Sequence, residues 1–207
     1  IQWGQLTGTS KALAIAHSAK THPGFFLVIT PDRNDANQLN DELAFVLKNE
    51  PIEIFNFPDW ETLPYDHFSP HPDLVSERLA TLYQITRSAC DVVILPATTA
   101  LLRLPQEEYL AAHSFMLEKG QQLNLDALRA QSIRAGYAHV TQVLMPGEFS
   151  VRGGIIDLFP MGSVVPFRID LFDDEIESIR TFDVDTQRSL YPVNDIRLLP
   201  AREFPLD

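Results

Sequence analysis

The segment from Gln5 to Ala12 has the spacing of a degraded phosphate-binding loop. In a working loop, G-x-x-x-x-G-K-[ST], the glycines let backbone N–H groups surround the phosphates, the lysine neutralises them, and the hydroxyl holds magnesium. Here Gln5 and Ser10 stand at the glycine positions and Ala12 at the hydroxyl position, while Gly8 and Lys11 remain. We therefore expect no nucleotide hydrolysis. Taken alone, the segment is better explained as an ordinary strand-to-helix turn with a surface lysine.

Two further groups have side chains of the kinds that bind metals. His67 and His71 are near aspartates, but the prolines around them predict an extended loop rather than a helix that would direct both rings to one ion. Asp41 and Glu42 fall on the polar face of a predicted helix, not after a buried strand as a magnesium-binding pair would. No histidine has a recognisable sequence relation to a serine or cysteine nucleophile. We predict no metal site and no catalytic residue.

Arginines occur beside aromatic residues in the second half of the chain. Arg152 precedes Gly153-Gly154, and Arg168 lies in a strand-like run that leads to Phe172. Arginines next to an exposed aromatic side chain are typical of protein interfaces. Pairing of these arginines with nearby acidic residues explains them equally well. The acidic residues between 170 and 177 are better explained by turn formation than by acid–base chemistry.

The first half alternates between strand-like and helix-like patterns. Apolar runs predict strands at 25–30, 52–57 and 91–96, and the first of them is expected to be buried on both faces. Helices are predicted at 10–20, from 32 onward, at 73–88, and from 98. This alternation indicates a parallel sheet with right-handed crossovers, which is an α/β domain.

The second half has the pattern of a small α+β domain. A helix is predicted near 125–136, with Asn124 as its N-cap. Beyond it, 155–159 is strand-like, and 167–172 and 175–182 alternate around an acidic turn as a hairpin does. Pro105 and two glutamates interrupt the pattern near 104–114. We therefore predict two domains, at 1–113 and 114–207.

The composition limits the possible functions. The net charge is −12 and both halves are acidic. Because binding to the phosphate backbone of DNA needs a basic surface, autonomous DNA binding is not expected. No apolar run reaches the roughly 20 residues that span a bilayer. The single cysteine, Cys90, excludes an internal disulfide and favours the cytoplasm. The chain begins at Ile1 rather than at methionine, and we expect it to be a piece of a longer protein.

Two long stretches make the sequence recognisable. They are 58–78, with Pro58-Asp59-Trp60-Glu61-Thr62-Leu63-Pro64-Tyr65-Asp66, and 147–177, with Ser150-Val151-Arg152-Gly153-Gly154-Ile155-Ile156-Asp157-Leu158-Phe159-Pro160. Together they resemble the amino-terminal region of the bacterial transcription-repair coupling factor (Mfd) family. The second stretch is also similar to the excision-repair protein UvrB.

This resemblance implies a RecA-like α/β domain followed by a small α+β domain. The RecA-like domain would be incomplete in this piece and completed by a segment after Asp207. The small domain would dock on UvrA, the damage-sensing ATPase. Arg152, Arg168 and Phe172 match the family's UvrA-binding positions. The resemblance further implies that the fragment is a non-catalytic recruitment module without a cofactor. RNA polymerase and DNA would be bound by other regions of a translocase.

Two alternatives remain. One is an active RecA-like ATPase or a true UvrB, against which the altered residues of the phosphate loop argue. The other is a domain that binds DNA directly.

Overall fold

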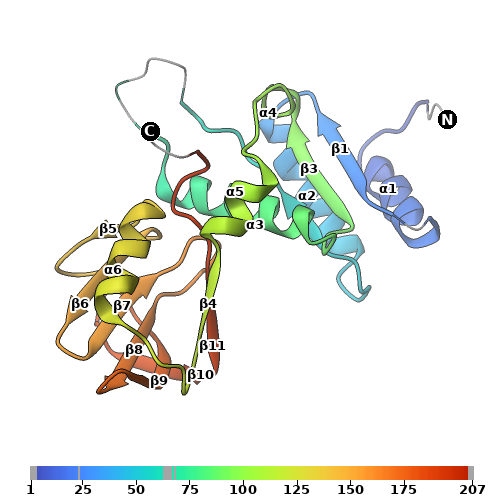
Figure 1. Cartoon of the computed structure of the whole chain (residues 1–207). Coiled ribbons are helices and arrows are strands. Elements are labelled where there is room, and N and C mark those ends of the chain that lie inside the picture. The colour runs from blue at the N-terminus through green and yellow to red at the C-terminus, as the bar shows by residue number, and fades with distance from the viewer. Residues whose placement is uncertain (1–3, 23, 63–66, 68, 205–207) are drawn as a thin grey trace. The chain divides into compact units, whose positions relative to one another are not determined.

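The computed structural model describes residues 4–22, 24–62, 67 and 69–204 (Figure 1). The chain separates into two compact units, one of residues 1–67 and 81–103 and the other of residues 68–80 and 104–207. These units are defined by contacts rather than by independent folding, so the domain limits 1–113 and 114–207 stay a prediction.

The first unit is a parallel sheet with helices, as the alternating pattern predicted. Its elements are α1 (Ser10–Thr21), β1 (Phe26–Thr30), α2 (Arg33–Val46), β2 (Ile54–Asn56), the last turns of α3 (Pro72–Thr86), β3 (Val92–Pro96) and α4 (Ala97–Ala100). The strand order is β1-β3-β2, and both pairings are parallel. The observed α/β class confirms the coarse prediction for this half.

The apolar core of the first unit lies between the sheet and helices α1 and α2. Ala12 and Ala16 of α1 and Leu39 and Leu43 of α2 are buried there with the central strand β3. Strand β1 is buried on one face only, because Leu27 and Ile29 on its other face are exposed. The prediction that this strand is covered on both faces is therefore wrong, whereas β3 is buried at every position. A continuous apolar run does not distinguish an edge strand from a central one.

The second unit is built on an antiparallel sheet. Its elements are α5 (Glu107–His113), β4 (Phe115–Glu118), α6 (Leu125–Arg134), β5 (Ala138–His139), β6 (Glu148–Arg152), β7 (Ile155–Phe159), β8 (Phe167–Phe172), β9 (Glu175–Phe182), β10 (Ser189–Val193) and β11 (Asp195–Leu198), with the first turns of α3. Six strands are ordered β10-β9-β8-β7-β6-β5, and β4 pairs separately with β11 (Figure 1). Within the large sheet, β5 alone runs parallel to its neighbour.

Local signals explain two helix starts in this unit. The side chain of Asn124 accepts a hydrogen bond of 2.9 Å from the backbone N–H of Ala127, which confirms the predicted cap of α6. Helix α5 was not predicted, since Glu107 and Glu108 were interpreted as an interruption. Both glutamates lie in its first turn, where negative charge is favourable next to the helix dipole.

The two edges of the large sheet are short or irregular. Strand β5 has only two residues, Ala138 and His139. At the opposite edge, β10 contains Pro192, and its register with β9 shifts between Ser189 and Pro192. Proline has no N–H to donate and is tolerated in edge strands for that reason.

A buried ion pair fixes the first turns of α3 within the second unit. The Arg78 Nε donates to the Glu203 Oε1 at 2.5 Å and Nη2 donates to Oε2 at 3.2 Å, and both side chains are fully buried. Burial raises the pKa of the Glu203 carboxyl from its ordinary value, and the hydrogen bond from Arg78 offsets only part of this effect. Nearby, the Ser76 hydroxyl accepts a 2.7 Å hydrogen bond from the backbone N–H of Gly162.

Neutralising this pair is expected to destabilise the protein strongly. Glu203→Gln leaves the buried Arg78 guanidinium without its counter-ion, so the free energy of unfolding should fall by about 3–5 kcal/mol. Urea titration followed by circular dichroism measures the change. The control is Glu50→Gln, which breaks the exposed pair of Lys20 and Glu50 and should cost less than about 1 kcal/mol. Equal losses in the two variants would contradict the expectation.

Candidate functional site: the arginine face

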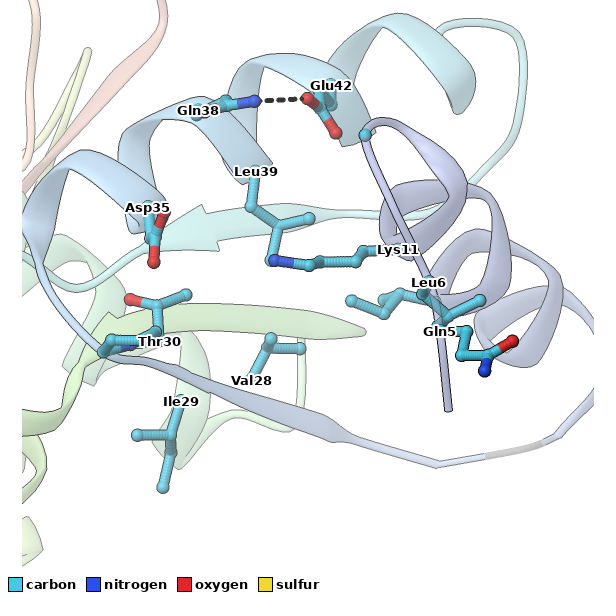
Figure 2. Close-up of a pocket in the computed structure, with 13 residues that line it drawn as sticks. Gln5, Leu6, Lys11, Val28, Ile29, Thr30, Asp35, Gln38, Leu39 and Glu42 are labelled. Atoms are coloured by element: carbon cyan, nitrogen blue, oxygen red, sulfur yellow. Dashed lines mark hydrogen bonds between the residues drawn. The ribbon is translucent and has the colours of Figure 1, made fainter. Parts of the chain in front are cut away.

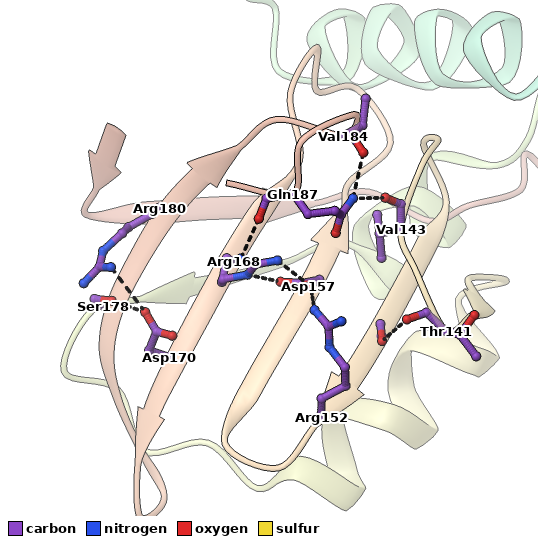
Figure 3. A network of polar contacts seen from close by, with 11 residues as sticks. Thr141, Val143, Arg152, Asp157, Arg168, Asp170, Ser178, Arg180, Val184 and Gln187 are labelled. Atoms are coloured by element: carbon purple, nitrogen blue, oxygen red, sulfur yellow. Dashed lines mark hydrogen bonds and ion pairs between the residues drawn. The ribbon is translucent and has the colours of Figure 1, made fainter. Parts of the chain in front are cut away.

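One face of the large sheet is apolar, and the other carries charged side chains together with the buried Phe159 and Phe182. Phe149, Ile156, Ile169 and Ile179 are buried on the first face. Because side chains alternate along a strand, their neighbours in sequence lie on the second. We call this second face the arginine face; it comprises Arg152 on β6, Asp157 on β7, Arg168, Asp170 and Phe172 on β8, and Ser178 and Arg180 on β9 (Figure 3).

A buried carboxylate organises the centre of the arginine face. Asp157 is 1% exposed and stands opposite Arg168 on the neighbouring strand. The Arg168 Nε donates to Asp157 Oδ1 at 2.6 Å, and its Nη2 donates to Oδ2 at 2.9 Å. Arg152 donates to the same Oδ2 from the other side (Figure 3). The two-pronged contact with Arg168 is the strong, directional form of this pairing.

Arg168 is held by more than its carboxylate partner. Its Nη1 donates to the backbone oxygen of Gln187 at 3.0 Å, and its guanidinium carbon lies 4.9 Å from the centre of the Phe182 ring. The hydrogen bond that Arg168 donates to Asp157 raises the pKa of Arg168 above its ordinary value despite partial burial. Only 16% of this side chain is exposed. Arg168 is therefore a fixed positive charge rather than a mobile one.

Arg152 and Phe172 are far more accessible. The Arg152 side chain is 52% exposed although it contacts Asp157, and Phe172 is 70% exposed. Phe172 is the last residue of β8, next to the turn residue Asp173, whose φ is 52°. It lies on the same face as Arg168 because four positions separate them along the strand.

The structure therefore places all three residues predicted to bind UvrA on one face of the sheet, and it joins Arg152 and Arg168 through Asp157. The sequence allows the arginines to be interpreted either as interface residues or as partners of nearby acidic residues. The two interpretations are compatible, because both arginines pair with Asp157 and Arg152 also remains exposed. The sequence interpretation missed Asp157. Its signal was an acidic residue inside the apolar run Ile155–Phe159.

The phosphate-loop segment borders a cavity of about 650 Å³ in the first unit (Figure 2). Gly8 and Lys11 line this cavity. The Ser10 hydroxyl donates to the backbone oxygen of Thr7 at 2.6 Å, within its own loop. Ala12 is fully buried in the apolar core under α1. The position at which a working loop carries its magnesium-binding hydroxyl thus packs against apolar side chains.

The other side of this cavity carries negative charge. Asp35 and Glu42 of α2 line it together with Lys11, and Glu42 accepts a hydrogen bond of 2.8 Å from Gln38 (Figure 2). Glu42 thus lies on a helix, as predicted, and not after a buried strand. Two carboxylates around one lysine make the cavity unfavourable for a polyphosphate.

The remaining candidates form no further site in the described part of the chain. The His71 Nδ1 lies 3.4 Å from the Asp73 Oδ2, and both side chains are exposed. Within the described residues, no three histidine, cysteine, aspartate or glutamate side chains are grouped so that they could hold a metal ion. Leu63 to Asp66 and Phe68, which belong to the first recognisable stretch, lie outside the described residues. The helices described here include none long and apolar enough to cross a membrane.

Known families match this chain where the arginine face lies. Residues 115–204 match the family model of the UvrB interaction domain, so the second unit carries a domain of that class. The chain is also 48% identical over 204 residues to a transcription-repair-coupling factor of Escherichia coli, and 46% identical over 204 residues to that of Haemophilus influenzae. A third relative, from Bacillus subtilis, is 31% identical over 200 residues.

These matches cover 99%, 99% and 96% of the chain. Almost the whole chain is thus similar to a segment of transcription-repair-coupling factors. It spans 18%, 18% and 17% of the length of these relatives, so it corresponds to one segment of such a protein.

The two arginines of the site are expected to differ in their contribution to stability. Arg168→Ala leaves the buried Asp157 with only the exposed Arg152 as a charged partner, and we expect the free energy of unfolding to fall by about 2 kcal/mol. Arg152→Ala keeps the two-pronged pair and should cost less than about 1 kcal/mol. Urea titrations of the two variants measure the difference. A larger loss for Arg152→Ala would show that Arg152, not Arg168, neutralises the buried carboxylate.

Proposed function

We propose that the chain is a non-catalytic recruitment module that binds UvrA through the arginine face and so brings excision repair to a stalled RNA polymerase. The observation that carries the proposal is the placement of Arg152, Arg168 and Phe172 on one sheet face. Similarity to transcription-repair-coupling factors and the match to the UvrB interaction domain support it.

The chemistry of the face suits a protein partner. Arg152 has half of its side chain exposed, so it can donate to a carboxylate of the partner while it keeps its contact with Asp157. Phe172 offers an exposed aromatic ring of the kind that fills an apolar pocket at the centre of an interface. Arg168 contributes a fixed charge on the same face, and fixed groups lose little entropy on binding.

The first unit is proposed to be a RecA-like domain that has lost its nucleotide site, with neither a cofactor nor enzymatic activity of its own. The parallel order β1-β3-β2 and the loop at the start of α1 support this relationship. The buried Ala12 and the carboxylates of Asp35 and Glu42 argue against binding of ATP and magnesium.

The chain spans 18% of the length of a relative. The proposal therefore assigns RNA polymerase binding, DNA binding and translocation to other parts of the full-length proteins. A bacterial repair complex of this kind acts in the cytoplasm. The single cysteine, Cys90, is free and buried, which is compatible with that compartment.

Binding to UvrA is expected to depend on the predicted residues. A pull-down with purified UvrA should retain the wild-type chain, and Arg168→Ala combined with Phe172→Ala should reduce retention at least tenfold, because central arginine and aromatic residues dominate interface energies. Circular dichroism confirms that the double variant is folded. Unchanged retention of a folded double variant would overturn the assignment of the interface.

A matched control uses a residue away from the arginine face. Arg134 is exposed near the end of α6 and not on the large sheet. Arg134→Ala should leave retention unchanged, and the comparison separates a local effect from the loss of one positive charge.

Nucleotide binding is expected to be absent. Calorimetric titration of the chain with Mg-ATP should give no heat of binding at micromolar concentrations, since the loop lacks a magnesium-binding hydroxyl and the cavity contains two carboxylates. A micromolar dissociation constant would instead favour the active ATPase alternative.

A further inference from the structure

Arg180 is a third arginine on the arginine face, and its position is unusual. On β9 it stands directly opposite Arg168 of β8 in the antiparallel register. Directly opposite residues point to the same face, and two like charges there destabilise the pairing. Asp157 on β7 forms an ion pair with Arg168. Of the two opposed arginines, Arg180 is therefore the one whose charge is less well neutralised.

The contacts of Arg180 within the chain are weak. Its Nη1 lies 4.0 Å from the Asp170 Oδ2, and that oxygen accepts a hydrogen bond of 2.7 Å from the Ser178 hydroxyl. Figure 3 shows the guanidinium at the end of this contact, beside β9. The Arg180 side chain is 48% exposed, close to the value of 52% for Arg152. Arg180 therefore keeps hydrogen-bond donors available to a partner.

We propose that Arg180 is a further binding residue of the docking surface, and that Arg152, Arg168 and Arg180 together form a row that recognises a protein surface bearing at least two separated carboxylates. This inference rests on the proposed function and extends it by one residue and by the chemistry of the partner.

The geometry of the sheet defines the spacing of those carboxylates. Arg152 is on β6 and Arg180 on β9, with β7 and β8 between them. Neighbouring strands are about 4.8 Å apart, and the register offsets Arg180 from Arg152 by two residues along the strands, so the two backbone positions are roughly 16 Å apart. The two exposed guanidinium groups stand at the ends of the row, and Arg168 stands between them. A partner engages both ends only if its acidic groups are similarly spaced.

Charge supports a partner of this kind. The chain carries a net charge of −12, yet this face brings three arginines together, with Asp157 and Asp170 as the carboxylates that contact them. The register places Glu148 and Glu175 on the same face, so the arginines form a local cluster of donors rather than a positive face, and such a cluster suits carboxylates of a protein partner. A carboxylate bound by Arg180 also relieves the repulsion from Arg168. An arrangement that weakens the free sheet is thereby stabilised in the complex, as is common at functional sites.

The test measures affinity for purified UvrA by titration of Arg180→Ala, Arg180→Lys and Arg180→Glu. We expect about tenfold weaker binding for Arg180→Ala, and a greater loss for Arg180→Glu, since the new charge repels the partner's carboxylates. Arg180→Lys should retain part of the affinity, because it keeps the charge but not the forked hydrogen bonds. Arg134→Glu on α6 is the matched control and should bind as the wild type does.

Stability provides a second readout that a merely structural role would not reproduce. Removing one of two opposed arginines should leave the melting temperature of Arg180→Ala unchanged or higher, while binding weakens. Affinities for Arg180→Ala and Arg180→Glu within about twofold of wild type would overturn the inference, provided that Arg168→Ala with Phe172→Ala still weakens binding. Absence of UvrA binding by the wild-type chain would instead overturn the proposed function, and this inference with it.

Discussion

The requirement to neutralise one buried carboxylate shapes the arginine face. Asp157 lies at the centre of an antiparallel sheet, where an unpaired negative charge would cost several kcal/mol. Its neighbours across the sheet and along it supply the two arginines, and the arginines take their orientation from it. Three strands, β6, β7 and β8, must keep their register for this arrangement to exist, because a slip of one residue would turn the carboxylate to the apolar side. The arginine face is consequently as rigid as the sheet that carries it.

Much of the fold could be predicted because its signals are local. The alternation of 167–182 predicted the hairpin of β8 and β9, and Asn124 predicted the start of α6. Non-local features were missed or misinterpreted. The burial of β1 depends on what lies over each of its faces, which its apolar run does not encode. The role of Asp157 depends on cross-strand partners 5 and 11 residues away. The three positions predicted to bind UvrA were assigned from family resemblance. Arginines beside an aromatic residue indicated an interface, but no local pattern joins Arg152 to Arg168 and Phe172.

The two units differ in what determines the residue at a position of interest. In the first, Ala12 occupies a position where a nucleotide-binding loop needs a hydroxyl, and it packs in the core with Ala16 and Leu39. This position buries apolar surface instead of presenting a hydroxyl. In the second, charged side chains remain on the sheet face even where two arginines oppose each other. Packing accounts for Ala12, and the proposed docking on a partner accounts for the two opposed arginines.

The edges of the large sheet have a consequence for recognition. An open sheet can capture a partner by adding a strand to its edge, through main-chain hydrogen bonds that depend little on side-chain identity. Here one edge is only Ala138 and His139, and the other carries Pro192 and a shifted register, so both edges offer a poor template for strand addition. Under the proposed function, recognition is therefore left to side chains on the face. Selectivity on this surface can therefore change by single substitutions while the backbone stays the same.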